Sequence, residues 1–387
     1  MRVISRAQCE LGKGLVRLGL YPVALPLLIS AANAGLAEAQ MMVGIACLNG
    51  KGVKANDTEA FLWLQKAAHQ GNAVSQRTLG IMYYNGRGTD RDRAEGAKWF
   101  EAAAHRGDSP SQIQLGRIYL TGDGVQKDYA KAFKWLSQRS HQGNANVQAM
   151  LGYLYKDGLG VEKNQAEARK WLERAARQGQ ADAQSALGNM AELGDPKDFD
   201  AAFNWYRQAA KQKNHVAEYN LGRLFENGMG TGKDITAAAH WYRLAAEGGC
   251  APAQYNLSVM LQKGVGVSAN AEEAARWCEK AAIQGNTAAC QNLGVFYKEG
   301  IGVEQDYAQA AAYLRKAADD NQPLAQFHLG ELYEKGLGVD CDQSAAIEYY
   351  RRAASNGVEA AKARLQALGV PVGGIASGVV WTAKLSS

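Results

Sequence analysis

The order of apolar and polar positions repeats along most of the chain, and each copy contains two segments with helical spacing. In residues 145–180, Leu151 and Tyr155 follow the spacing of one helix face, and Trp171 and Ala175 follow the same spacing in the second half. An Asp-Gly-Leu-Gly-Val turn separates the halves, and glycine at a helix end accepts the positive φ that terminates it. The pattern therefore predicts a repeated unit of helix, Gly-rich turn, helix and short turn.

The repeat keeps its register over nearly the whole chain. The third residue after a pair of small residues marks it, at Gly35, Gly71, Gly107, Gly143, Gly179, Lys213, Gly249, Gly285, Asn321 and Gly357. Eight of the nine intervals are 36 residues and one is 34. Because a single repeat would leave one apolar face in water, the copies must stack on one another. The prediction is an all-α solenoid of about nine to ten helix-turn-helix repeats.

Two further positions recur in each copy. A glycine lies in the middle of the first helix, where it costs about 1 kcal/mol relative to Ala, and close approach of the partner helix would offset that cost. An aromatic residue recurs in the second helix and is predicted to form the core between repeats, at Trp63, Trp99, Trp135, Trp171, Trp205, Trp241, Trp277, Tyr313 and Tyr349.

Residues 149–161 and 168–179 carry a signature that resembles the Sel-one-like repeat family, the 36-residue relatives of tetratricopeptide repeats. The resemblance covers residues 37–358 as nine tandem repeats. A degenerate capping repeat is expected at 1–36, a capping helix at 359–370 and a non-repeat tail at 371–387. The resemblance implies a right-handed superhelix whose first helices line the concave side.

The resemblance also implies a groove, and first-helix residues between the core positions are expected to face it. The candidate partner-binding residues are Met41, Ile45, Arg77, Ile81, Tyr84, Ile113, Arg117, Tyr153, Tyr219, Arg223, Tyr255 and Phe327. Aromatic residues with Arg between them are typical of protein-binding hot spots. The alternative is that neighbouring first helices cover these side chains and make them part of the core.

Members of this family resemble adaptors and scaffolds, so the leading hypothesis is a scaffold that binds another protein in the groove. One alternative is a bacterial immunity protein that neutralises a toxic effector. Another is a secreted or envelope protein that contacts a host or a cell-envelope partner. The fold alone does not decide among them.

Charge and composition narrow the classes of molecule that the protein is expected to bind. The 43 basic and 38 acidic residues are spread along the chain and give a net charge of +5, whereas nucleic acid requires a denser basic stripe. The six cysteines show no metal-binding spacing. His69, His105 and His141 recur every 36 residues, but equivalent positions in stacked repeats lie too far apart to share one ion. We expect no nucleic acid, metal or cofactor.

No catalytic motif is recognisable. The loop at residues 228–233 resembles a phosphate-binding loop, but it lacks the four intervening residues and the Lys-Ser or Lys-Thr ending that this loop requires. There is no strand-turn-helix serine elbow, and no cysteine has a plausible base nearby in the sequence. The sequence therefore predicts a protein that is not an enzyme.

Targeting and terminal segments complete the picture. The apolar stretch at residues 15–32 is interrupted by Arg17, Pro22 and Pro26, so neither a signal peptide nor a membrane span is expected. This favours the cytoplasm and leaves the periplasm or the envelope open. The tail, with Trp381, is expected to be either flexible or an extended strand on the last repeat.

Two departures from the repeat pattern stand out. The 34-residue copy reads Glu-Leu-Gly-Asp-Pro at residues 192–196, where the others have a Gly-x-Gly-Val turn. Ser258 replaces the mid-helix glycine of a later repeat. We expect a change of curvature or of loop exposure at the first of these positions.

Overall fold

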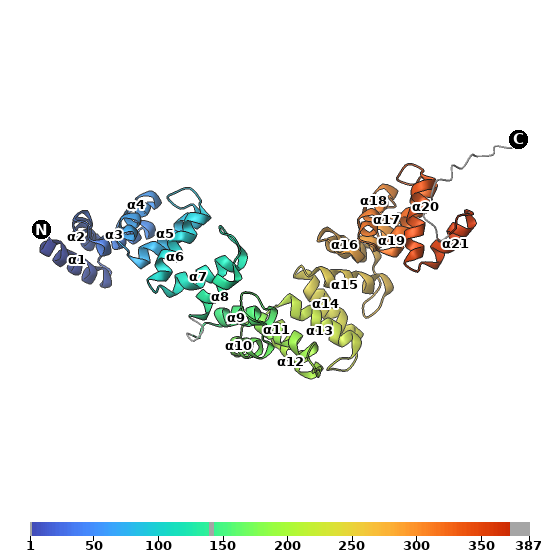
Figure 1. Cartoon of the computed structure of the whole chain (residues 1–387), viewed down its shortest axis with the longest axis horizontal. Coiled ribbons are helices and arrows are strands. Elements are labelled where there is room, and N and C mark those ends of the chain that lie inside the picture. The colour runs from blue at the N-terminus through green and yellow to red at the C-terminus, as the bar shows by residue number, and fades with distance from the viewer. Residues whose placement is uncertain (1, 139–142, 372–387) are drawn as a thin grey trace. The chain divides into compact units, whose positions relative to one another are not determined.

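The computed structural model describes residues 2–138 and 143–371, and within these ranges the chain forms 21 helices and no strand. The helices follow one another as hairpins along the chain (Figure 1). The predicted all-α solenoid of about nine to ten repeats is confirmed.

Odd-numbered helices are the first helices of the hairpins: α1 (Arg2–Arg17), α3 (Ala37–Asn49), α5 (Ala73–Asn85), α7 (Ser109–Thr121), α9 (Ala145–Asp157), α11 (Ala181–Glu192), α13 (His215–Asn227), α15 (Ala251–Lys263), α17 (Thr287–Glu299), α19 (Pro323–Lys335) and α21 (Glu359–Ala367). Even-numbered helices are the second helices: α2 (Tyr21–Asn33), α4 (Asp57–His69), α6 (Arg93–His105), α8 (Tyr129–Ser137), α10 (Gln165–Arg177), α12 (Phe199–Ala210), α14 (Ile235–Glu247), α16 (Ala271–Ile283), α18 (Tyr307–Asp319) and α20 (Gln343–Ser355).

Capping residues set the helix ends at each repeat. α13 ends at Gly228, whose φ of 69° lies in the left-handed region that glycine adopts without strain. α14 begins after Asp234, whose side chain accepts a hydrogen bond from the backbone N–H of Ala237 at 2.9 Å. Between them, Gly230 also has a positive φ and packs against the backbone of Phe199 in the preceding repeat. The Gly-x-Gly turn therefore ends a helix and docks on the neighbouring repeat.

The core lies between each first helix and the second helices on either side of it. Its deepest side chain is the one that follows the recurrent aromatic, and this side chain is 0–3 % exposed in all nine repeats: Leu64, Phe100, Leu136, Leu172, Tyr206, Tyr242, Cys278, Leu314 and Tyr350. The tryptophans themselves lie nearer the surface. Trp135 and Trp171 are buried, whereas Trp63, Trp99, Trp205, Trp241 and Trp277 are half-buried. The predicted aromatic column thus forms the outer layer of the core.

Cations cover several of these outer aromatic rings. Lys66 Nζ lies 4.5 Å from the centre of the Trp63 ring, and Lys280 Nζ lies 4.3 Å from that of Trp277. Each cation stands three residues after its aromatic, one turn along the same helix face. The part of these rings that the core leaves uncovered is therefore covered by the alkyl stem and the charge of a lysine on the same helix.

Buried glutamines connect consecutive repeats. Gln254 Nε2 donates to the carbonyl oxygen of Ala246 in the preceding repeat at 3.1 Å, and Gln254 Oε1 accepts from Gln284 Nε2 at 2.8 Å. The same amide pair recurs as Gln40 with Gln70 and as Gln148 with Gln178. These bonds satisfy carbonyls near helix ends that would otherwise be buried without a donor.

One repeat replaces this pair with different chemistry. Glu218 stands where seven of the other eight repeats have glutamine, and Gly248 stands at the position from which Gln70, Gln178 and Gln284 donate. The imidazole of His215 packs against Gly248, and its Nδ1 lies 2.8 Å from Glu218 Oε2. Because Gly248 has no side chain, the imidazole of His215 has room to lie beside it and to contact the buried carboxylate of Glu218.

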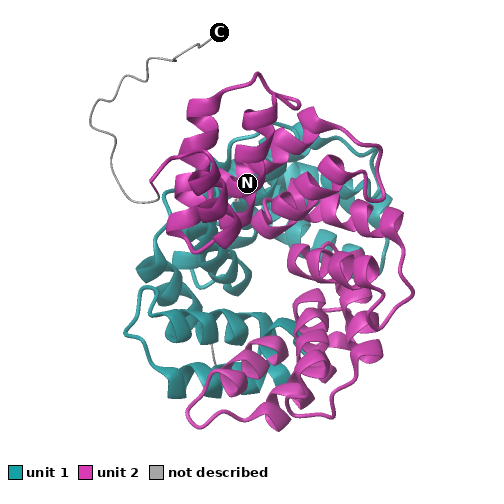
Figure 2. Cartoon of the chain, turned by 90° about the vertical axis from the view of Figure 1, so that its right-hand side faces the viewer, with its two compact units in different colours: residues 1–183 teal, residues 184–387 magenta. Residues whose placement is uncertain are grey.

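The chain divides into two compact units, residues 1–183 and 184–387 (Figure 2). The change of unit falls in the 34-residue repeat, the departure noted in the sequence. Leu193, in the altered turn of that repeat, is 69 % exposed. Each unit is considered by itself below.

The ends of the chain continue the helical pattern. A Cβ on Gly12 of α1 would lie 2.7 Å from Leu28 of α2, the contact that Gly44 makes with Leu64 in the next repeat. The short helix α21 follows the last full repeat. Capping by these segments remains a prediction, and the predicted tail, Trp381 included, lies outside the described residues apart from Pro371.

Candidate functional site

Three first helices of unit 1, α5, α7 and α9, carry two neighbouring pockets, and we call their surface the first-helix face. The Ile81 pocket, at α5 and α7, has a volume of about 270 Å³. It is lined by Arg77, Ile81, Tyr84, Asn85, Phe100, Pro110 and Gln114. Ile81 is a large apolar side chain that is 44 % exposed. Three predicted groove residues therefore meet in one pocket.

Polar contacts hold the walls of the Ile81 pocket. Arg77 Nη1 donates to Asp108 Oδ1 at 2.6 Å, and Asp108 also caps α7. The Tyr84 ring lies 5.6 Å from that of Phe100, and its hydroxyl donates to the carbonyl oxygen of Asp123 at 2.7 Å. Burial, and next the neighbouring Asp123 carboxylate, raise the pKa of Tyr84 to about 12, so it remains a neutral donor. Both side chains are held in place before any ligand arrives.

The Arg117 pocket lies next to the first, at α7 and α9, with a volume of about 420 Å³. It is lined by Ile113, Arg117, Asn144, Asn146, Ala149, Met150, Tyr153, Gln180 and Asp182. The Tyr153 hydroxyl donates to the carbonyl oxygen of Asp182 at 2.9 Å, and burial raises its pKa to about 12. The exposed Arg117 side chain has no hydrogen bond or ion pair with any residue of 2–138 or 143–371. Its charge is available to a ligand.

A third pocket lies nearer the N-terminus, at α1, α2 and α3, with a volume of about 220 Å³. It is mostly apolar and is lined by Val16, Tyr21, Leu25, Leu28, Met42, Ile45, Ala46, Asn49 and Lys51. Of the two candidate residues on α3, Ile45 lines this pocket. Met41 is half-buried and lines none of the three pockets.

The candidate residues of unit 2 are engaged within the protein. Arg223 Nη2 donates to the buried Glu192 at 2.8 Å, and the Tyr219 ring lies 5.8 Å from that of Tyr242. The Phe327 ring lies 5.7 Å from the Tyr350 ring, and Tyr255 packs half-buried against the core. These four residues therefore contact other residues of unit 2, and a binding role for them stays a prediction.

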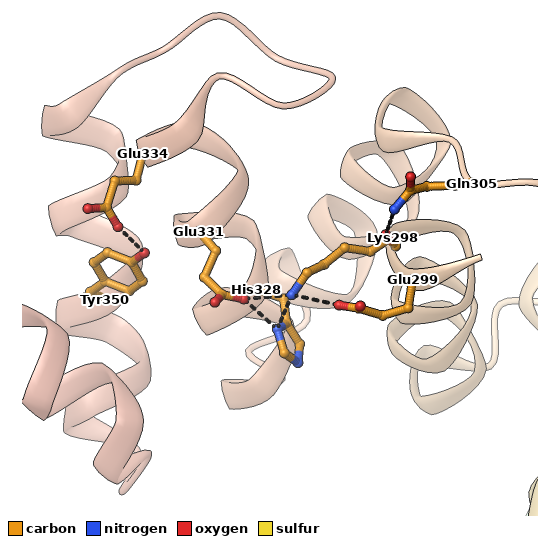
Figure 3. Close-up of polar contacts among 7 residues, drawn as sticks. All are labelled: Lys298, Glu299, Gln305, His328, Glu331, Glu334 and Tyr350. Atoms are coloured by element: carbon orange, nitrogen blue, oxygen red, sulfur yellow. Dashed lines mark hydrogen bonds and ion pairs between the residues drawn. The ribbon is translucent and has the colours of Figure 1, made fainter. Parts of the chain in front are cut away.

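A cluster on α17 and α19 was not recognised in the sequence (Figure 3). Lys298 Nζ donates to Glu331 Oε2 at 2.7 Å, and His328 Nδ1 lies 2.9 Å from the same oxygen. Burial opposes ionisation of Glu331, but its hydrogen bonds with His328 and Lys298 outweigh burial and lower its pKa to about 2. The cluster therefore ties one first helix to the next.

The sequence contains a signal for such ties. Their opposite charges lie 30 to 33 residues apart, slightly less than one period, in Arg77 with Asp108, Glu192 with Arg223, Lys298 with Glu331, and Glu334 with Arg364. A search for this spacing would have found the cluster. It would also have shown that Arg77 and Arg223 already have partners.

Metal and membrane chemistry are not apparent in the described part of the chain. Within residues 2–138 and 143–371, no three His, Cys, Asp or Glu side chains could hold a metal ion. His69 and His105 instead lie edge-on to Trp99 and Trp135, and His141 lies outside the described residues. None of the described helices has the length and apolar character needed to cross a bilayer.

Nine consecutive stretches match the model of the Sel1 repeat. They are residues 37–72, 73–108, 109–144, 145–180, 181–214, 215–250, 251–286, 287–322 and 323–358. Their boundaries reproduce the 36-residue register, including the single copy of 34.

Two solved structures resemble the chain at substantial identity. One is c5321, described as a protective antigen present in uropathogenic Escherichia coli strains and displaying an SLR fold. It is 34 % identical over 95 % of this chain and 81 % of its own, with a TM-score of 0.72. The other is a Sel1 repeat protein from Oxalobacter formigenes, 33 % identical over 84 % of this chain and 93 % of its own, with a TM-score of 0.59.

A weaker likeness connects the chain to the immunity protein Pa5087 from Pseudomonas aeruginosa. It is 20 % identical over 55 % of this chain and 81 % of its own, with a TM-score of 0.33, a level that carries no argument about function. None of the curated proteins matches the sequence.

Proposed function

Because the chain belongs to the Sel1 repeat family, with nine repeats between residues 37 and 358, we propose that it is a scaffold that binds a segment of a partner protein on the first-helix face of unit 1. Sel1 repeats generally mediate protein binding. The face formed by α5, α7 and α9 offers what such binding requires, an apolar anchor site beside an unpaired charge.

The observation that carries this proposal is the pair of neighbouring pockets. Ile81 and Arg117 occupy the same position in consecutive repeats, 36 residues apart, and each lines one pocket. Pockets of about 270 and 420 Å³ suit individual side chains better than a whole structural element. An extended segment would place an apolar side chain at Ile81 and an acidic or carbonyl group at Arg117.

Preorganisation supports the same surface. Arg77, Tyr84 and Tyr153 are each held by a hydrogen bond within unit 1, so ordering them costs little on binding. Arg117 is the group whose charge a partner could neutralise. Arg is among the residues that dominate binding energy when a partner excludes water from them.

Affinity capture from a lysate of the source organism tests the proposal, with wild type compared with the Ile81→Glu/Arg117→Glu double variant. The control is Leu62→Glu, because Leu62 is exposed to a similar degree but lies on second helix α4. We expect at least one protein that wild type and Leu62→Glu retain and the double variant loses about tenfold or more. Equal recovery of every captured protein by all three would contradict the proposed face.

A second candidate function is contact with a host or with the cell envelope. The observation that favours it is the likeness to the E. coli protective antigen, since a protective antigen is one that the host's immune system meets. Protease treatment of intact cells tests it: cleavage before permeabilisation is expected, and protection until lysis would exclude it. Neutralisation of a toxic effector is not proposed, because nothing in the first-helix face favours it.

A further inference from the structure

The pocket at α1, α2 and α3, which we call the Ala46 pocket, shares no residue with the two pockets of the first-helix face. Its volume is about 220 Å³. Ala46 lines it, two residues after the mid-helix glycine Gly44, together with Leu25 and Leu28 of α2. These three lining residues are buried, so the pocket is apolar where it is deepest.

The pocket exists because Ala46 is small. In each of the other Sel1 repeats, the residue two positions after the mid-helix glycine, or after Ser258 in its place, is methionine, leucine, isoleucine or phenylalanine. These side chains are mostly buried, and six of them are at most 2 % exposed: Met82, Ile118, Leu154, Leu224, Phe296 and Leu332. The repeat at residues 37–72 therefore lacks a side chain that packs the core of its relatives.

The next repeat shows what a large side chain does at this position. Met82 lies in one core cluster with Phe61 and Leu64 of α4. These two residues stand 36 positions after Leu25 and Leu28, so Met82 fills the space that is left open beside α2. Protein interiors are close-packed and hold few voids larger than a water molecule. An open space of this size at a core position is therefore one that a ligand can fill.

A positive charge stands at the mouth of the Ala46 pocket. Lys51 and Asn49 line the pocket and are exposed, unlike the buried residues at its bottom. Lys51 Nζ lies 3.5 Å from the Tyr21 hydroxyl oxygen and 5.3 Å from the centre of the Tyr21 ring. No carboxylate in the described part of the chain forms an ion pair with Lys51.

The next repeat neutralises the charge at this position. Lys51 stands in the middle of a Gly-x-Gly turn, beside the first residue of the preceding second helix. In the next repeat the same two positions hold Arg87 and Asp57, and Arg87 Nη2 lies 2.7 Å from Asp57 Oδ1. Because α2 begins with Tyr21 where α4 begins with an acid, the Lys51 charge is available to an anion.

We propose that the Ala46 pocket binds a small monocarboxylic acid with a compact apolar body. An apolar cavity of about 150 Å³ holds a benzene ring, so this larger pocket has room for a ring and one or two further carbon atoms. The body lies against Ala46, and the carboxylate accepts hydrogen bonds from the Lys51 ammonium and the Asn49 amide. A single ammonium suits one negative charge, whereas phosphate carries nearly two and is commonly held by Arg. The site does not depend on the proposed binding of a partner protein.

Calorimetric titration of the full chain with hydrocinnamate, a phenyl ring joined by two carbons to a carboxylate, tests the proposal. The wild-type chain is expected to bind hydrocinnamate with a dissociation constant below about 1 mM. The neutral amide of the same acid is expected to bind at least about tenfold more weakly, because it forms no ion pair with Lys51.

Replacement of the lysine tests the role of its charge. Lys51→Met keeps most of the stem and is expected to remove the preference for the acid over the amide. Lys54→Met is the matched control, because Lys54 is exposed in the same turn but does not line the pocket. It is expected to bind both probes as the wild-type chain does.

Filling the pocket tests the cavity itself. Ala46→Met introduces the side chain that Met82 and Met260 provide in their own repeats. This variant is expected to unfold at or above the wild-type temperature and to bind neither probe. Because Lys51 is exposed, Lys51→Met decides the proposal even if Ala46→Met does not fold.

Four results would overturn the proposal. Three are the absence of hydrocinnamate binding by the wild-type chain at about 10 mM, equal binding by Lys51→Met, and undiminished binding by a folded Ala46→Met. The fourth concerns an acetylated pentapeptide that ends in phenylalanine with a free carboxylate. If it binds at least about tenfold more tightly than hydrocinnamate, the occupant is the C-terminus of a protein and not a small acid.

Discussion

Three buried tyrosines of this protein are each matched with a glutamate of the same repeat. The hydroxyls of Tyr206, Tyr242 and Tyr350 donate to Glu192, Glu226 and Glu334 at 3.1, 2.6 and 2.7 Å. Where the deep core residue is not tyrosine, no glutamate stands at the other position, as in Leu48 with Leu64. An unpartnered buried hydroxyl costs about 1–3 kcal/mol, so the two positions are expected to change together.

The ion cluster at Glu331 predicts a specific acid sensitivity. Its pKa is about 2 in the folded protein against an ordinary 4.5, so its contribution is fully present above pH 4.5 and is lost as pH falls through about 2. In urea unfolding, the wild-type chain is expected to lose about 2 kcal/mol more than Glu331→Gln between pH 6 and pH 3.

Glu299→Gln is the matched control for this prediction. Glu299 lies 3.3 Å from the same Lys298 ammonium but is 52 % exposed, so water screens its charge. Its loss is expected to leave the pH dependence of unfolding close to that of wild type. Equal pH dependence in wild type and Glu331→Gln would show that the cluster does not stabilise the fold.

At the scale of the helices, the mid-helix glycine sets how closely the two helices of a repeat approach. A Cβ on Gly222 of α13 would lie 2.6 Å from the Tyr242 ring of α14. Where serine takes the place of glycine, at Ser258, the facing residue is the smaller Cys278, and the serine hydroxyl donates to the carbonyl oxygen of Ala274 at 2.7 Å. Helix spacing and side-chain size are therefore matched within each repeat.

This matching predicts the sign of a glycine-to-alanine change. Gly222→Ala removes the helix cost of glycine, about 1 kcal/mol, but forces Tyr242 or its helix to move. Thermal unfolding is expected to show a net destabilisation of about 1–3 kcal/mol. Gly14→Ala serves as the control, because a Cβ there meets nothing within 4 Å and is expected to stabilise by up to about 1 kcal/mol. Stabilisation by Gly222→Ala would refute the close-packing role.

At the scale of the whole molecule, each unit is a row of repeats that depend on their neighbours. Within a unit, a first helix packs on the second helix of its own repeat and on that of the repeat before. Stability in such a stack is close to a sum of repeat terms and neighbour terms. A destabilising change at one end of a unit is therefore expected to lower the stability of the nearest repeats only.

Removal of residues 1–36 tests this locality. It would expose Ala39 and Val43 of α3, which are 0 % and 1 % exposed in the intact chain. Hydrogen exchange is expected to speed up in α3 and α4 and to remain unchanged in α9. The full-length chain measured in parallel provides the reference, and a uniform rise across residues 37–183 would show that unit 1 unfolds as a single body.

Much of the fold could be predicted from the sequence, and the candidate site only in part. The period of 36 identified the helices, their turns and the 34-residue exception, because these follow from local apolar spacing and from glycine. The binding role of the first-helix positions stays a prediction. The sequence did not show which of them have partners within the chain: Arg77 and Arg223 are hydrogen-bonded to residues of neighbouring helices, whereas the Arg117 side chain has no partner among residues 2–138 and 143–371.

The sequence by itself determined the repeat, since each 36-residue copy must hide the same apolar face and end its helices at the same glycines. It did not determine which aromatic lies deepest, because Trp241 and Tyr242 are neighbours and only the crossing of α13 and α14 decides between them. Tertiary structure also decided which first-helix side chains have partners within the chain. These outcomes depend on contacts between repeats, and local periodicity carries no information about which neighbour a side chain will meet.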